Sequence, residues 1–310
     1  MMSAGAETRD SLVPRRGEPW TPIPLTRWSG AYLEEKGIEN GRLDAEIMLA
    51  HVLGLTRLDL YLQFDRPIQP GELKSFKALL LRRASREPLQ YVLGSSTFRE
   101  LELRLDSRAL VPRPETEVLV EEVLSWARGQ EGELACVDMG TGSGAIALSL
   151  LWEGPFRRVV ATDASPMALE LARENAALHG LLEKIEFREG FLFQPFRPGE
   201  RFDALISNPP YVPTGDRDGL DPEVRDWEPH GALFAGPDGL DLLVPLVTEG
   251  HGLLRSGGLL ATAVGHGQAQ GIAELMERTG AYQEVRIVSD LAGRERIVLG
   301  VATGGVLEEV

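Results

Sequence analysis

From residue 133 to residue 264, short apolar segments alternate with segments whose apolar residues recur at helical spacing. Strands and helices that alternate in this way build a parallel sheet with helices on both of its faces. Two more apolar segments follow with no helix between them. We therefore predict an α/β fold with strands at 135–138, 158–163, 185–188, 202–207, 259–264, 282–288 and 296–301, and helices at 145–152 and 166–179.

The part of the chain before this region has a different pattern. Between Leu25 and Arg86 the apolar residues recur at helical spacing, in one helix that ends near Gly54 and another that spans 71–86. Over 101–106 leucines alternate with charged residues, which predicts a half-exposed strand and, with the residues before it, a β-hairpin. A small bundle of helices can serve packing or partner recognition, and the sequence leaves both open.

These patterns divide the chain into four parts. A length of 310 residues leaves room for two domains. We expect a flexible tail at 1–20, a helical domain at 21–94, a β-hairpin linker at 95–112 and the α/β domain at 113–310.

Charge and composition exclude several kinds of function. The net charge of −15 opposes nonspecific binding to nucleic acid, which depends on basic residues that neutralise phosphates. The single cysteine, Cys136, lies in an apolar run and is expected in a buried strand, so no internal disulfide forms. The histidines have no metal-ligand spacing, and we expect no metal site. No apolar run is long enough to span a membrane, and no signal peptide is recognised. A single cysteine fits a reducing compartment, and we expect a cytoplasmic protein.

A glycine-rich turn follows the first strand of the α/β region. Glycines at 140, 142 and 144 allow a sharp turn and let a ligand approach the backbone at the start of a helix. Asp163 closes the second strand, where an acidic residue accepts hydrogen bonds from ribose hydroxyls. The turn and Asp163 together predict a nucleoside-bearing cofactor. Because Gly140, Gly142 and Ala145 also match the dinucleotide fingerprint, a nicotinamide cofactor remains an alternative on these residues alone.

The fourth strand ends in Asn208-Pro-Pro-Tyr211, at the edge of the sheet where open α/β proteins bind ligands. The prolines have no N–H groups, so this corner offers carbonyl acceptors, and Asn208 adds a side-chain acceptor. An amino group awaiting methylation is a hydrogen-bond donor. The corner is therefore suited to hold a planar –NH2 group by its hydrogens, and Tyr211 is expected to stack on that group.

Asn-Pro-Pro-Tyr after the fourth strand is the signature of S-adenosylmethionine enzymes that methylate planar nitrogens. Further segments extend this match: Pro88-Leu-Gln-Tyr-Val-Leu-Gly94, Phe98, Val111-Pro-Arg-Pro-Glu-Thr-Glu117, Glu228-Pro, Ala232-Leu and Gly236-Pro-Asp-Gly-Leu240. In this combination the sequence, over about residues 25–303, resembles the protein-(glutamine-N5) methyltransferases of peptide chain release factors, the HemK/PrmC family.

The resemblance implies a Rossmann-like methyltransferase domain at 113–310 and a substrate-recognition role for the helical domain. S-adenosylmethionine would be the cofactor, and the glutamine of the Gly-Gly-Gln motif in class I release factors the substrate. It implies a cofactor site made of Gly140, Thr141, Gly142, Ser143, Gly144, Asp163, Phe191 and Asn208. Asn208, Pro209 and Tyr211 would be the catalytic residues, and the substrate site would also include Pro210, Phe98 and Arg113.

Two positions differ from the family pattern or allow more than one role. The residue before Phe191 is Gly190, where the family often has an acid, which puts contacts to the adenine amino group in doubt. Arg113 would help close the pocket, or form a structural ion pair with Glu115 or Glu117.

No histidine, lysine or carboxylate is placed as a base, so we expect catalysis by orientation of the amide. A nucleic-acid amino methyltransferase, such as one acting on adenine N6, and a ribosomal-protein glutamine methyltransferase are the nearest alternatives. An NAD-dependent oxidoreductase or a noncatalytic binding module would leave Asn208 to Tyr211 without a role.

Overall fold

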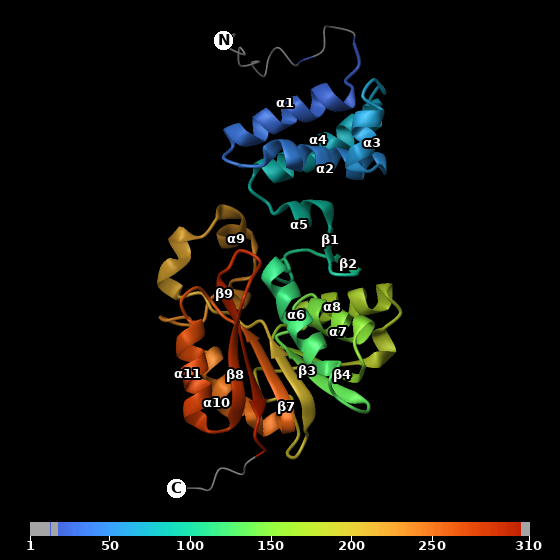
Figure 1. The fold of residues 1–310 in the computed structure, drawn as a ribbon. Coiled ribbons are helices and arrows are strands. Elements are labelled where there is room, and N and C mark those ends of the chain that lie inside the picture. Colours follow the sequence, from blue (N-terminus) through green and yellow to red (C-terminus); the bar gives the residue numbers. More distant parts are fainter. Residues whose placement is uncertain (1–12, 14–17, 305–310) are drawn as a thin grey trace. The chain divides into compact units, whose positions relative to one another are not determined.

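The computed structural model describes Val13 and residues 18–304, which form two compact units, one ending at Gly94 and the other beginning at Ser95 (Figure 1). The predicted tail at 1–20 lies mostly outside the described residues. Trp20, its last residue, packs edge-on against Trp28 at a centroid distance of 6.1 Å, and its carbonyl accepts a hydrogen bond from the Ile68 N–H at 2.8 Å. Trp20 therefore belongs to the helical unit and not to a tail.

The first unit is a bundle of helices: α1 (Pro22–Glu35), α2 (Gly41–Leu53), α3 (Arg57–Leu62), α4 (Pro70–Ala84) and α5 (Leu89–Leu93). The predicted end of a helix near Gly54 is confirmed, because Gly54 caps α2 in the left-handed conformation. Helices α1 and α2 pack closely at two glycines. A Cβ atom built on Gly41 would lie 2.6 Å from the Gly30 carbonyl oxygen, so a larger residue would push the helices apart.

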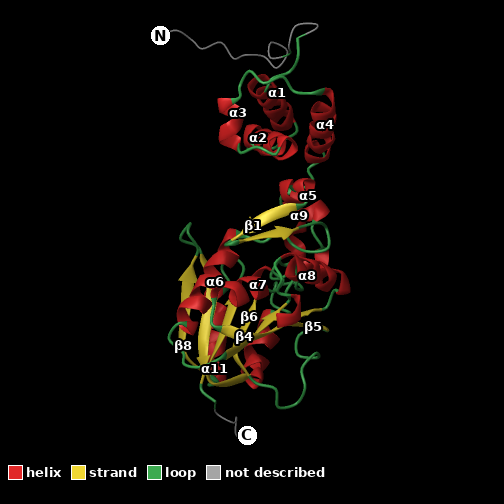
Figure 2. Cartoon of the chain, turned by 90° about the vertical axis from the view of Figure 1, so that its right-hand side faces the viewer, coloured by secondary structure: helices red, strands yellow, loops and turns green. Residues whose placement is uncertain are grey.

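The second unit is built on a seven-stranded sheet (Figure 2). Its strands are β3 (Leu134–Met139), β4 (Phe156–Asp163), β5 (Ile185–Glu189), β6 (Phe202–Ser207), β7 (Leu254–Ala263), β8 (Tyr282–Ser289) and β9 (Glu295–Ala302). Their order in the sheet is β5-β4-β3-β6-β7-β9-β8, and β9 runs antiparallel to both of its neighbours. The α/β fold predicted from the alternating pattern is confirmed, including the final pair of strands with no helix between them.

Helices cover both faces of the sheet. They are α6 (Pro114–Ala127), α7 (Ala145–Glu153), α8 (Pro166–Leu178), α10 (Leu243–Glu249) and α11 (Ala269–Thr279), and the short α9 (Pro222–Trp227) lies in the loop after β6. Successive residues of β3 point to opposite faces, as strand geometry requires. Cys136 belongs to the core with α6 and α7, whereas Val137 belongs to the core with α10 and α11. Both faces are apolar because both are covered.

The hairpin of β1 (Ser95–Phe98) and β2 (Leu101–Arg104) belongs to the second unit. Leu101 and Leu103 lie in the core beside α6 and α7. The Arg104 N–H donates to Asn175 Oδ1 of α8 at 2.8 Å, and Asn175 Nδ2 donates to the Ser143 carbonyl at 2.9 Å. The hairpin is thus a packed part of the α/β unit, in contrast to the linker expected from the sequence.

Strand β7 begins at Leu254, five residues before its predicted start. Its register against β6 shifts between Phe202 and Ala204, next to the pair Gly257-Gly258. The glycines interrupt the apolar alternation, which hides the first half of the strand from a periodicity argument. Among the described residues, no helix is both long and apolar enough to cross a membrane.

The strand order determines where a ligand can bind. After β3 the chain builds β4 and β5 on one side, and then returns to place β6 on the other side of β3. The connections that leave β3 and β6 diverge, which opens a crevice at the carboxyl ends of these strands.

Candidate active site

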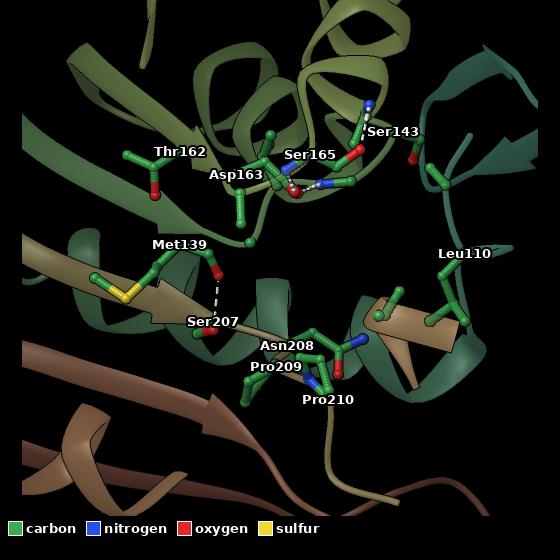
Figure 3. Close-up of a pocket in the computed structure, with 18 of the residues that line it drawn as sticks. Leu110, Met139, Ser143, Thr162, Asp163, Ser165, Ser207, Asn208, Pro209 and Pro210 are labelled. Atoms are coloured by element: carbon green, nitrogen blue, oxygen red, sulfur yellow. Dashed lines mark hydrogen bonds between the residues drawn. The ribbon is translucent and has the colours of Figure 1, made fainter. Parts of the chain in front are cut away.

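A cavity of about 440 Å³ lies at the carboxyl ends of β3, β4 and β6 (Figure 3). Asp163 at the end of β4 and Asn208 after β6 lie on opposite sides of the opening. The fold brings together these predicted site residues as its lining: Gly140, Thr141, Gly142, Ser143, Asp163, Phe191, Asn208, Pro209 and Pro210.

Four predicted site residues do not line this cavity. Gly144 caps α7 with a φ of +86°, and a Cβ there would meet Leu148 at 3.2 Å, so this glycine serves the packing of the turn. Phe98 is 1% exposed and lies in the core. The Tyr211 ring packs against both cores, and Arg113 turns toward an acidic partner described below. Stacking of Tyr211 on a substrate stays a prediction.

The glycine turn and Asp163 support each other. The N–H groups of Gly140 and Thr141 both donate to the Thr162 carbonyl at 2.8 Å, which draws the turn against the end of β4. Asp163 then accepts from the Gly142 N–H through Oδ2 and from the Ser165 N–H through Oδ1, each at 2.9 Å. Burial raises the pKa of Asp163, and these N–H groups oppose that effect. Each carboxylate oxygen keeps a lone pair for a further donor.

Asp138 is a functional candidate that was not predicted from the sequence. It is buried in β3, and its Oδ2 accepts from Thr141 Oγ1 at 2.6 Å and from the Ala147 N–H at 3.0 Å. Oδ1 has no partner within the described structure. Burial raises the pKa of Asp138 to about 7. The sequence feature that could have identified Asp138 is an acidic residue inside an apolar strand, two positions before the first glycine of the turn.

Replacing Asp138 with asparagine should flatten part of the pH dependence of stability. Because the native pKa of about 7 exceeds the ordinary 3.8, the native state binds a proton that the unfolded chain releases between these values. The contribution of Asp138 to the free energy of unfolding therefore falls as pH rises through this window. From pH 5 to pH 8, Asp138→Asn should gain about 1 to 4 kcal/mol relative to the wild type.

Chemical denaturation of both proteins without cofactor, at several pH values, measures this difference. Other titrating groups cancel because they are common to both proteins. Two stability curves that stay parallel from pH 5 to pH 8 would show that Asp138 ionises normally.

Phe191 covers another side of the cavity and keeps 47% of its surface exposed. The glycine before it is required by the fold. A Cβ atom on Gly190 would lie 2.6 Å from Pro195 Cγ, and the glycine φ is +155°. The glycine at position 190, where the family often has an acid, is therefore explained by the close packing of Pro195 against it.

The corner after β6 faces the cavity from the opposite wall. Ser207 Oγ donates to the Met139 carbonyl at 2.7 Å and so ties the end of β6 to the end of β3 (Figure 3). Asn208 Nδ2 donates to Thr116 Oγ1 of α6 at 3.1 Å. The other end of the carboxamide, Oδ1, is an acceptor. Thr116 lines the same cavity, and the sequence analysis did not name it as a site residue although it lies within Val111–Glu117.

Arg113 pairs with neither of the expected glutamates. Its Nη2 donates to both carboxylate oxygens of Glu228, at 2.8 and 2.7 Å, whereas Glu117 accepts from the Arg99 N–H. Glu228 is buried, which raises its pKa, and Arg113 opposes that rise. Because Pro229, directly after Glu228, lines the cavity, the ion pair holds one wall in position. A pairing across 115 residues has no local sequence signal.

Removal of Arg113 should destabilise the protein more at high pH than at low pH. Arg113→Ala leaves the buried Glu228 carboxylate without its partner, and the partial exposure of the arginine moderates the cost. We expect a loss of about 1 to 3 kcal/mol at pH 8. The loss should shrink toward pH 5, because the Glu228 pKa rises further and the carboxyl can take up a proton.

Denaturant unfolding at both pH values measures the effect. Arg113→Ala combined with Glu228→Gln is the matched control, and it should recover most of the stability at pH 8. An equal loss at both pH values, without recovery in the double variant, would contradict this account.

Within the described part of the chain, no cluster of histidine, cysteine, aspartate and glutamate side chains has the arrangement of a metal site. Cys136 is a free, fully buried cysteine, as predicted. Burial raises the pKa of its thiol well above the ordinary value, so the residue is a packing element and not a nucleophile.

Comparison with known proteins gives consistent results for both units. Residues 25–94 match the PrmC N-terminal domain, and residues 115–219 match the methyltransferase small domain. The release factor glutamine methyltransferase of Geobacter sulfurreducens is 43% identical over 286 residues, which cover 91% of this chain and 97% of that protein. The release factor glutamine methyltransferase of Rhodopirellula baltica is 37% identical over 283 residues, covering 90% of this chain and 96% of that protein.

Among solved structures, the hMettl16 catalytic domain in complex with the MAT2A 3'UTR hairpin 6 has a TM-score of 0.54 and 15% sequence identity. The match covers 72% of this chain and 83% of that one. At this identity the similarity concerns the fold alone, and it agrees with the sheet described above.

Proposed function

The chain belongs to the release factor glutamine methyltransferases, and on that premise we propose the details of its reaction. It transfers a methyl group from S-adenosylmethionine to the side-chain nitrogen, N5, of the glutamine in the Gly-Gly-Gln motif of class I release factors. The reaction takes place in the cytoplasm, where release factors act. One observation supports this proposal most directly: a single cavity has Asp163 on one wall and the Asn208-Pro209 corner on the other.

The residues around the cavity fit S-adenosylmethionine. The free lone pairs of Asp163 suit the two ribose hydroxyls, which are donors. The backbone of Gly140 to Ser143 suits the methionine part, because the glycines at 140 and 142 have no side chains and let it lie against the turn. Phe191 lines the cavity and keeps 47% of its surface exposed, and its ring suits stacking on the adenine. The residue directly before Phe191 is Gly190, which has no side chain to contact the adenine amino group, so we expect stacking and shape to contribute most to adenine recognition.

S-adenosylmethionine, when bound, supplies a methyl group on a positively charged sulfur, which is a good leaving group. The amide nitrogen is a weak nucleophile because its lone pair is delocalised into the carbonyl. Asn208 Oδ1 and the Pro209 carbonyl accept the two N–H hydrogens and aim the nitrogen into the cavity. The same oxygens stabilise the positive charge that develops on the nitrogen.

The step balances without a further reactant. With S-adenosylmethionine held at the cavity, the nitrogen lone pair would form the new N–C bond, and the electron pair of the broken C–S bond would stay on sulfur as a neutral thioether. The nitrogen then loses one proton to water. No side chain of the site needs to act as a strong base, in agreement with the orientation mechanism expected from the sequence.

A methyl-transfer assay with labelled cofactor tests the proposal. Unmethylated release factor, the same factor with its Gly-Gly-Gln glutamine replaced by alanine, ribosomal protein and total nucleic acid are offered separately. We expect label on the unchanged release factor alone, and mass spectrometry should locate it on the glutamine side chain. Label on the alanine variant would contradict the Gly-Gly-Gln assignment, and label on nucleic acid would show that the corner holds a base.

We further propose that the helical unit recognises the release factor. Leu58 and Leu62 lie one turn apart on α3 and are 67% and 68% exposed, and Phe64, two residues after the end of α3, is 61% exposed. Exposed apolar side chains at neighbouring positions of one short segment are typical of protein interaction surfaces. Leu58→Asp with Leu62→Asp should lower kcat/KM for the whole release factor and leave cofactor affinity unchanged. An unaltered kcat/KM would exclude this surface.

A further inference from the structure

The residue that anchors the Asn208 carboxamide lies on a different element. Resting on the proposed role of Asn208, we propose that Thr116 is a positioning residue for methyl transfer. Its hydroxyl accepts a hydrogen bond from Asn208 Nδ2, which leaves Oδ1 as the group presented to the substrate nitrogen. Thr116 therefore acts through Asn208 and not on the substrate itself.

The geometry of this pair is specific. Thr116 lies in the first turn of α6 and is 3% exposed, and its Oγ1 is 3.1 Å from Asn208 Nδ2. The two residues are 92 positions apart in the chain and line one cavity. The sheet order, with α6 packed beside β7 and β3 beside β6, brings them together.

The chemistry of a carboxamide makes its orientation important. The two ends of the group have nearly the same shape, but Oδ1 only accepts hydrogen bonds and Nδ2 only donates them. The –NH2 group of a substrate amide presents donors alone. A flipped Asn208 would set donor against donor, so one orientation binds the substrate and the other repels it. In the structure Thr116 accepts from Nδ2 and so holds the carboxamide in the orientation that leaves Oδ1 for the substrate.

Both partners are held independently of each other. The Thr116 N–H donates to the Arg113 carbonyl at 2.9 Å, and the Arg113 side chain is fixed by the buried Glu228. On the other side, Ser207 Oγ ties the strand end before Asn208 to the Met139 carbonyl at 2.7 Å. The hydroxyl and the amide therefore meet without a mobile segment between them, which is the condition for pre-organisation.

A double-mutant cycle tests the proposal. The proteins are the wild type, Thr116→Val, Asn208→Ala and the double variant, with Thr116→Ser added as the conservative replacement. Valine has the shape of threonine without the acceptor, so Thr116→Val should lower kcat about 10-fold or more. Thr116→Ser should stay within about threefold of the wild type, because it keeps the hydroxyl. In the Asn208→Ala background, Thr116→Val should change kcat less than about twofold.

Thr26→Val is the matched control. Thr26 is a buried helical threonine of the helical unit, 1% exposed, whose Oγ1 donates to the Pro22 carbonyl at 3.0 Å. This variant should lose stability but keep kcat. Cofactor affinity by calorimetry and thermal unfolding establish that each variant is folded, and Thr116→Ala replaces Thr116→Val in the cycle if the valine variant unfolds.

The outcomes distinguish a failure of the proposed role of Asn208 from a failure of the proposed role of Thr116. If Asn208→Ala keeps the wild-type kcat, the proposed function of the corner fails. If Asn208→Ala is impaired and Thr116→Val is not, the positioning role fails alone. An equal loss from Thr116→Val in both backgrounds, or a Thr116→Ser variant as impaired as Thr116→Val, would also overturn it, because a merely structural threonine would give those results.

Discussion

Asn208→Ala should lower kcat for release factor methylation by about 100-fold or more, with cofactor affinity changed by less than about threefold. The side chain provides one of the two acceptors for the substrate –NH2 group, and the Pro209 carbonyl provides the other. Without Oδ1 the nitrogen is no longer aimed by both of its hydrogens, and the charge that develops on it loses a stabilising dipole. The cofactor keeps the glycine turn and Asp163, which this change does not touch.

Single-turnover kinetics and calorimetry, carried out on the same preparations, measure the two effects. Asn40→Ala is the matched control, because Asn40 is an exposed residue of the helical unit whose side chain makes no capping hydrogen bond. Equal losses in kcat and in cofactor affinity would show that Asn208 serves to bind the cofactor. In that case the orientation mechanism would be wrong.

Asp163→Ala should weaken the binding of S-adenosylmethionine by about 100-fold. Two effects add. The ribose loses a charged acceptor, and the N–H groups of Gly142 and Ser165 lose the carboxylate that holds them at 2.9 Å. The glycine turn is then free to move away from the cavity. Asp163→Asn should weaken binding less, because its remaining oxygen still accepts one of these hydrogen bonds.

Calorimetric titration with S-adenosylmethionine measures the affinity, and kcat at saturating cofactor separates binding from chemistry. We expect kcat to change far less than the dissociation constant. Asp65→Ala, an exposed carboxylate of the helical unit, is the control. Unchanged affinity in Asp163→Ala would remove this residue from the cofactor site and place the ribose elsewhere.

Much of the fold follows from local sequence patterns. The order of apolar and helical segments predicted the strands and the α/β class, since both periodicities arise from backbone geometry within a few residues. The turn at Gly140–Gly144 and the corner at Asn208–Tyr211 were also recognised, because each is a continuous segment at the end of a predicted strand. Parallel neighbouring strands bring such ends to one edge of the sheet.

Other features depended on packing. Phe98 was expected at the site, but its ring belongs to the core, and Tyr211, whose stacking on a substrate stays a prediction, packs against both cores. From the sequence, an aromatic residue near a motif is equally compatible with a place in the core and a place in the binding site. Only the side chains that surround it in the folded protein decide between the two. Likewise, the first half of β7 was not predicted from the sequence, because its two glycines have no side chains and interrupt the alternation of apolar and polar residues.

The sequence by itself therefore determined the fold class, the two local motifs and, through its resemblance to a family, the reaction expected of them. Only the tertiary structure decided which distant side chains meet. It pairs Arg113 with Glu228 and Asn208 with Thr116, and it requires Gly190 next to Pro195. The first two pairs join residues 115 and 92 positions apart, across elements whose neighbours are set by the strand order. That order results from packing the whole chain, and no local periodicity records it.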